Sequence, residues 1–94
     1  MENKIKDIIN LISNVTNLFY QNKVQEAYQK LQQLLEALAI VVDEFYQGGI
    51  LGADDTTILE ILKEVMCAME KKDTLLVADM LEYELKDALL KLKL

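Results

Sequence analysis

Hydrophobic residues recur every three or four positions along most of this chain, which is the spacing of one face of an α-helix. Four such segments follow one another, over residues 2–21, 23–47, 56–71 and 73–93. No segment alternates apolar and polar residues in the way that a half-buried strand does, and the chain has no proline. The pattern therefore predicts an all-α protein.

Three breaks separate the predicted helices. Asn22, with Gln25 three residues later, is predicted to start the second helix as a side-chain cap. The glycine-containing run QGGILGADD is predicted to turn the chain between the second and third helices. Thr57 followed by Glu60 predicts a capped start for the third helix, and Asp73 predicts one for the fourth. Short breaks within each half, with a longer loop between the halves, favour an antiparallel up-down-up-down four-helix bundle in a single domain spanning residues 1–94.

The two halves of the chain also resemble each other. A shift of fifty residues places Ile58 on Ile8, Leu62 on Ile12 and Leu85 on Leu35. One interpretation is that an αα-hairpin has been duplicated. The other is that two amphipathic helices can be slid into partial register by chance, and the predicted fold does not depend on which is right.

The fourth predicted helix carries more apolar surface than one core face needs. One stripe consists of Val77, Leu81, Leu85, Ala88 and Leu92, and a second of Leu76, Met80, Tyr83, Leu90 and Leu94. The second stripe has three interpretations: part of a broad core, a self-association surface, or a groove for a partner helix. Tyr and Met suit a contact surface. We expect the second stripe to form an intermolecular contact, with the chain as a homodimer.

Charge and composition narrow the range of partners. The net charge is −6, from 16 acidic residues against 10 lysines, with no arginine, so nucleic acid is not an expected partner. The longest apolar run, residues 38–42, is too short to span a membrane, and no signal-peptide pattern is present. A single cysteine forms no internal disulfide, which favours the reducing cytoplasm.

Candidate catalytic groups are few. The chain has no histidine, which excludes histidine phosphorelay, Glu-x-x-His di-metal sites and Ser–His or Cys–His nucleophiles. Adjacent acidic residues such as Asp43 and Glu44 point apart on a helix and favour a solvated face. Cys67 is predicted to lie exposed among charged residues as an unreactive surface thiol. We therefore expect no enzyme activity, metal or cofactor.

The segment LGADDTTILEI, Leu51 to Ile61, resembles the signature of acyl carrier proteins. In that family the residue after L-G-A-D is the serine that carries phosphopantetheine, whereas this chain has Asp55 there. The resemblance implies, as an alternative function, a degenerate acyl-carrier-like protein without its attachment site. A capped helix start behind a glycine turn accounts for the same residues.

The segment AMEKKDTLLVADMLEYELKDALLKL resembles the C-terminal part of small uncharacterised helical proteins of clostridia and bacilli. In size and helical layout the chain is also similar to bacterial flagellar export chaperones, which hold unassembled subunits with their helices. The sequence thus predicts a cytoplasmic, non-catalytic helical module for protein–protein interaction, adaptor or chaperone-like.

Overall fold

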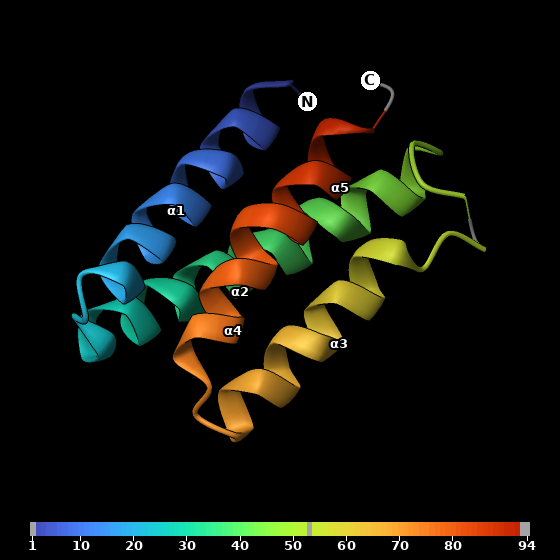
Figure 1. Cartoon of the computed structure of the whole chain (residues 1–94). Coiled ribbons are helices and arrows are strands. Elements are labelled where there is room, and N and C mark those ends of the chain that lie inside the picture. The colour runs from blue at the N-terminus through green and yellow to red at the C-terminus, as the bar shows by residue number, and fades with distance from the viewer. Residues whose placement is uncertain (1, 53, 93–94) are drawn as a thin grey trace.

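The computed structural model describes residues 2–52 and 54–92, and every regular element within these ranges is a helix (Figure 1). The first three helices are α1 (Glu2–Tyr20), α2 (Val24–Gln47) and α3 (Thr57–Glu70). They are followed by α4 (Thr74–Asp79), η1 (Met80–Leu85) and α5 (Lys86–Leu90). The all-α prediction is confirmed, and no strand is present in the described ranges.

The last three elements form one continuous helix, hereafter the C-terminal helix (Thr74–Leu90). Backbone angles stay helical through both junctions, with φ −65° and ψ −40° at Met80 and φ −56° and ψ −45° at Lys86. The middle element, η1, is a π-helix, in which hydrogen bonds join residues five apart and each turn holds more residues than the 3.6 of an α-helix. Four helices therefore make up the described parts of the chain.

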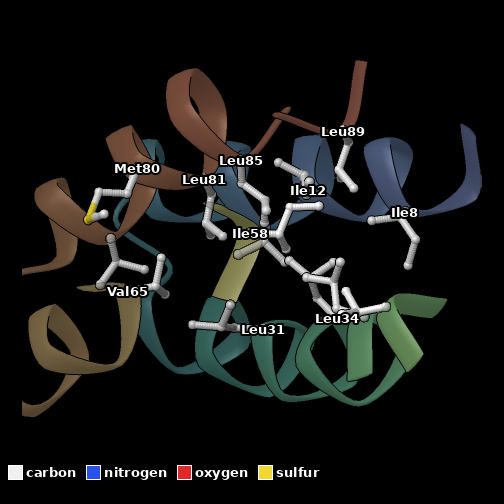
Figure 2. Close-up of a cluster of buried hydrophobic side chains, with 14 of the residues drawn as sticks. Ile8, Ile12, Leu31, Leu34, Ile58, Val65, Met80, Leu81, Leu85 and Leu89 are labelled. Carbon is white, nitrogen blue, oxygen red and sulfur yellow. The ribbon is translucent and has the colours of Figure 1, made fainter. Parts of the chain in front are cut away.

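The π-helix decides which side chains of this helix are buried. In a continuous α-helix, a row of residues four apart drifts steadily around the axis, because four residues exceed one turn. A wider turn removes this drift, so Leu81, Leu85 and Leu89 all point to the interior (Figure 2). Each of the three is at most 1% exposed. The first stripe predicted on this helix does not include Leu89, because that prediction assumes α-helical geometry throughout.

The first three helices all end in the same backbone turn. The second residue after each helix adopts a left-handed conformation, with φ 63° at Asn22, 77° at Gly49 and 56° at Lys72. Its N–H binds the carbonyl three residues back, and the next N–H binds the carbonyl five residues back, which is the Schellman motif. The predicted cap at Asn22 is therefore wrong. Asn22 lies in the turn that follows α1, where its short polar side chain tolerates the left-handed conformation, and Lys23 precedes α2 without a side-chain cap.

The starts of α3 and of the C-terminal helix differ in their hydrogen bonds. Asp73 accepts a hydrogen bond from the Leu76 N–H at 3.2 Å, which confirms the predicted cap of the fourth helix. Thr57, by contrast, is the first residue of α3 and not its cap, because Asp55 Oδ1 accepts the Thr57 N–H at 3.2 Å. Thr56 occupies the cap position, and its hydroxyl donates to Glu60 Oε1 at 3.2 Å. The predicted capping box between Thr57 and Glu60 is therefore not formed, since the Thr56 side chain caps no backbone N–H and bonds to Glu60 four residues away.

Helix packing is uneven around the core. α1 packs closely along α2 and along the C-terminal helix, and α3 packs along the C-terminal helix. In contrast, α2 and α3 do not pack closely along the described parts of their length. The core lies between all four helices, with Ile12 of α1, Leu31 and Leu34 of α2, and Ile58 of α3 pointing inward (Figure 2). No helix in the described ranges is both long and apolar enough to cross a membrane.

Candidate protein-binding groove between α2 and α3

The structure divides the second stripe predicted on the C-terminal helix. Leu76, Tyr83 and Leu90 are exposed, at 44%, 69% and 68%. Met80 is only 5% exposed and points into the core on the same side as Val65 of α3 (Figure 2). Its predicted place on an exposed surface is therefore wrong, because the C-terminal helix lies closely against α3 at this point. Leu94, the fifth predicted residue, lies outside the described residues.

The exposed members of this stripe have different surroundings. Leu76 lines a shallow depression together with Cys67 and Lys71 of α3. Tyr83 lies on the side of α1, where it is one of the groups that raise the pKa of Tyr20. The structure therefore does not gather the predicted stripe into one continuous apolar patch.

Polar side chains fasten α1 to the C-terminal helix. The Tyr20 hydroxyl donates to Asp79 Oδ1 at 2.7 Å, and this bond, with burial and nearby acidic charge, raises the pKa of Tyr20 to about 12. One turn away, the hydroxyl of Thr16 lies 3.4 Å from Glu82 Oε2, and Lys86 pairs with the same carboxylate at 2.8 Å. These groups satisfy one another, so the cluster holds two helices together and offers no free group for chemistry.

A largely apolar groove of about 330 Å³ lies between α2 and α3. We call it the α2–α3 groove. It lies where these two helices fail to pack closely. Seven of its eight lining residues are apolar or aromatic: Leu35, Ala39, Val42 and Tyr46 from α2, and Leu59, Leu62 and Met66 from α3, with Asp43 as the eighth.

Helical spacing accounts for each wall of the groove. The α2 residues are four, three and four positions apart, and the α3 residues are three and four apart, so each set lies on one helix face. Val42 is 5% exposed and belongs to the floor, whereas Leu59 and Met66 are 45% and 51% exposed. The Tyr46 hydroxyl donates to the carbonyl of Asp55. This bond joins the end of α2 to the approach of α3 and fixes the width of the groove at the loop end.

The two rims of the groove differ in charge. On the outer side of α2, Glu36 and Asp43 are exposed and lie seven residues apart, which places them along one line of the helix. Along the corresponding side of α3 run Lys63 and Glu70, also exposed and seven apart. The α2 rim therefore carries two negative charges, and the α3 rim one charge of each sign.

The groove was not predicted from the sequence. Leu35 and Val42 share the helical spacing of core residues in α2, and Met66 shares that of core residues in α3, so the apolar pattern does not set them apart. One available signal was the width of the apolar surface of α3, where Leu59 follows Ile58 and Met66 follows Val65. Each pair consists of two adjacent apolar residues, and the two pairs are seven residues apart. Together they widen the apolar surface of α3 beyond the single face that packs on the core.

The other candidate residues are accounted for by local structure. Cys67 is exposed, as predicted. Glu44 pairs with Lys4 of α1, and Asp43 accepts a hydrogen bond from Gln47 at 3.0 Å. Within residues 2–52 and 54–92, no cluster of three or more His, Cys, Asp or Glu side chains is arranged to hold a metal ion. Asp55, at the position of the carrier-protein serine, caps the start of α3.

The fold and the groove define a small all-α protein with one apolar edge left open. Over residues 1–94 the chain matches the family model described as "Domain of unknown function (DUF8042)", and it belongs to that family. No curated protein and no solved structure matches the chain.

Proposed function

We propose that this protein is a non-catalytic interaction module that binds another protein in the α2–α3 groove. The observation that carries the proposal is the groove itself: seven apolar or aromatic side chains line an opening between two helices of the same small fold. A contiguous apolar surface of this kind, rimmed by charged residues, is typical of a protein-binding site.

Burial energetics support this function. Complete burial of a large apolar side chain contributes about 1.5–3 kcal/mol, and Leu59 and Met66 retain about half of their surface for a partner to cover. Together they offer roughly 1.5–3 kcal/mol. Both line the α3 wall of a concave, largely apolar surface, where a bound partner would remove them from water.

The helix arrangement that we infer is the antiparallel up-down-up-down bundle. It is supported by the close packing of α1 with α2, of α3 with the C-terminal helix, and of the C-terminal helix with α1. In such a bundle α2 and α3 would be the fourth pair of neighbours. The groove is then the one edge of the bundle that remains open in the described parts of the chain.

A homodimer formed through the C-terminal helix is a second candidate. Leu76, Tyr83 and Leu90 are exposed on this helix, although the π-helix between Leu76 and Leu90 interrupts their α-helical spacing. With Met80 in the core, this surface holds three large side chains and no longer five. It is therefore the weaker of the two candidate interfaces.

Both the adaptor and the chaperone-like versions of the function use the groove in the same way, and we propose the cytoplasm as their setting. The carrier-like alternative receives no support from the site, because Asp55 has a structural role and supplies no hydroxyl. An adaptor would keep its partner bound, whereas a chaperone would release it. The partner's exchange rate distinguishes the two.

Photo-crosslinking in cells tests the proposal. A photoreactive phenylalanine at Leu59 should crosslink to a defined partner, and Met66→Glu in the same chain should abolish that product. Ile40 provides the matched control, since it is a large apolar side chain of α2, 63% exposed, that does not line the groove. Crosslinking at Leu59 that survives Met66→Glu, or an identical product from position 40, would contradict binding in the groove.

A further inference from the structure

We infer that the occupant of the α2–α3 groove is an amphipathic α-helix of a partner protein, with lysine or arginine beside its apolar stripe. This inference rests on the proposed function and specifies its ligand. Two independent observations carry it: the packing of a helix over the equivalent positions of α1, and the charge of the groove's rims.

The first hairpin shows what covers these positions when they are not open. By the fifty-residue shift, Leu62 and Met66 of α3 correspond to Ile12 and Thr16 of α1. Ile12 is 0% and Thr16 1% exposed, because the C-terminal helix packs along α1 there. Met66 is 51% exposed and Leu62 is half-buried. A helix thus covers this face of α1, whereas on α3 the corresponding helix, α2, does not pack closely and leaves the same face open to another helix.

The dimensions of the groove also suit a helix. Its α2 wall runs from Leu35 to Tyr46, which is roughly 17 Å at 1.5 Å per residue. A helix of about three turns matches this length. Two helical walls with an apolar floor form the arrangement in which an amphipathic helix binds through residues spaced i, i+3, i+4 and i+7.

Charge determines which amphipathic helix fits best. The chain carries a net charge of −6, and the α2 rim presents Glu36 and Asp43 to whatever lies in the groove. A partner helix with basic residues on that flank would pair with both carboxylates, whereas an acidic flank would be repelled. A second copy of this chain would bring the same acidic rim and another net charge of −6, which disfavours self-association through the groove.

Two synthetic peptides of about 18 residues, roughly 27 Å long when helical, provide the test. Both carry leucines at i, i+3, i+4 and i+7. One has lysines flanking this stripe, and the other has glutamates at the same positions. Because exposed ion pairs are weak, we expect the lysine peptide to bind the wild-type protein about threefold to tenfold more tightly, with the difference shrinking at high salt.

Three variants assign this binding to the groove and to its rim. The double substitution Glu36→Lys with Asp43→Lys should reverse the preference between the peptides. Met66→Glu should weaken binding of the lysine peptide at least tenfold, whereas Ile40→Glu should leave it unchanged. Circular dichroism verifies that each variant is folded, and Leu59→Glu replaces Met66→Glu if that variant unfolds.

Each contrary result has a distinct meaning. Equal affinity for the two peptides, unaffected by the rim reversal, overturns the charge inference and leaves groove binding standing. Failure of both peptides, with a partner still crosslinked from position 59, overturns the helical occupant alone. A wild-type dimer that Met66→Glu converts to a folded monomer shows that a second copy fills the groove, and the inference is wrong.

Discussion

Asn22 and Lys72, fifty residues apart, adopt the same left-handed backbone conformation, with φ 63° and 56°. In both turns the residue's N–H binds the carbonyl three positions earlier, and the following N–H binds the carbonyl five positions earlier, at 2.8–3.0 Å. The turns after α1 and α3 therefore share their backbone geometry and lie fifty residues apart in the chain. This agreement supports the hypothesis that one hairpin was duplicated.

The left-handed backbone at Lys72 predicts a stabilising substitution. A left-handed conformation costs roughly 1–2 kcal/mol for a residue with a Cβ, and glycine avoids this cost but loses more entropy on folding. Lys72→Gly should therefore raise the free energy of unfolding by about 0.5–1 kcal/mol in urea denaturation. Asn22→Gly should have a smaller effect, because asparagine tolerates this conformation. Lys71→Gly, at a φ of −81°, should destabilise the fold instead.

The burial of Met80 predicts a large difference between two members of the stripe expected on the C-terminal helix. Met80→Ala should reduce the free energy of unfolding by about 2–5 kcal/mol, because it leaves a cavity against α3. Leu90→Ala, at a position 68% exposed, should change it by no more than about 0.5 kcal/mol. Similar losses at the two positions in thermal or urea unfolding would contradict this difference in burial.

The difference in burial between Met80 and Leu90 also determines which variants can test for a homodimer formed through the C-terminal helix. A charge at Met80 would disrupt the core, so it cannot report on association. Leu90→Glu, with Tyr83→Glu as a second variant, alters only exposed positions. If the chain is a dimer through this helix, either variant should lower the mass in solution and preserve helicity. An unchanged mass in both variants would exclude this surface as the dimer interface.

The raised pKa of Tyr20 predicts a change in stability at high pH. The Asp79 hydrogen bond favours the neutral phenol in the folded chain, raising its pKa from 10.0 to about 12. The resulting stabilisation is fully present below pH 10 and is lost as the pH rises to about 12, because the unfolded chain releases this proton first. The effect should be modest, since Tyr20 is 48% exposed.

Phenolate absorbance and urea unfolding measure this effect. Tyr20→Phe should remove the latest step of the tyrosine titration, and Asp79→Asn should move that step to lower pH. The stability deficit of Tyr20→Phe relative to wild type should shrink between pH 10 and 12. Tyr83→Phe is the control, and the late step should persist in that variant. A titration that is the same in wild type and Tyr20→Phe would refute the role of the Asp79 bond.

The exposure of Cys67 predicts fast chemical labelling. A maleimide should modify Cys67 in the native protein at a rate within about tenfold of that in the unfolded chain, because the thiol reaches solvent. Cys67→Ser should abolish the labelling and leave thermal stability nearly unchanged. Protection far beyond tenfold in a native sample would show that the α3 side near Leu76 is covered.

Helical segments were predictable because burial on one side imposes a period that the sequence records directly. Ile12, Leu31 and Val65 each belong to an apolar series with helical spacing in their own helix, and all three are fully buried. The Asp73 cap was predictable for a similar reason, since its hydrogen bond reaches only three residues along the chain. Asn22 was misassigned because asparagine favours both helix starts and left-handed helix ends, and the local sequence does not separate the two.

The groove was harder to predict, because apolar spacing does not reveal what covers a helix face. Met66 has the same helical spacing as a core residue, and only the position of α2 leaves it open. Met80 shows the converse, since it looked like a surface residue and is buried. Both outcomes depend on how far apart whole helices lie, which is a property of the tertiary structure.

The π-helix also accounts for a difference of one residue between the second helix and the last helix. Up to the start of the π-helix, buried positions of the second and last helices correspond at a shift of 50, as in the pairs Ala27/Val77 and Leu31/Leu81. From the end of the π-helix onwards they correspond at 51, as in the pairs Leu34/Leu85 and Leu38/Leu89. The last helix thus contains a one-residue insertion relative to its counterpart, and the wider turn absorbs it. Deleting one residue within 80–85 should restore a regular α-helix with the same buried face. Relatives that differ in length by one residue are expected to differ here.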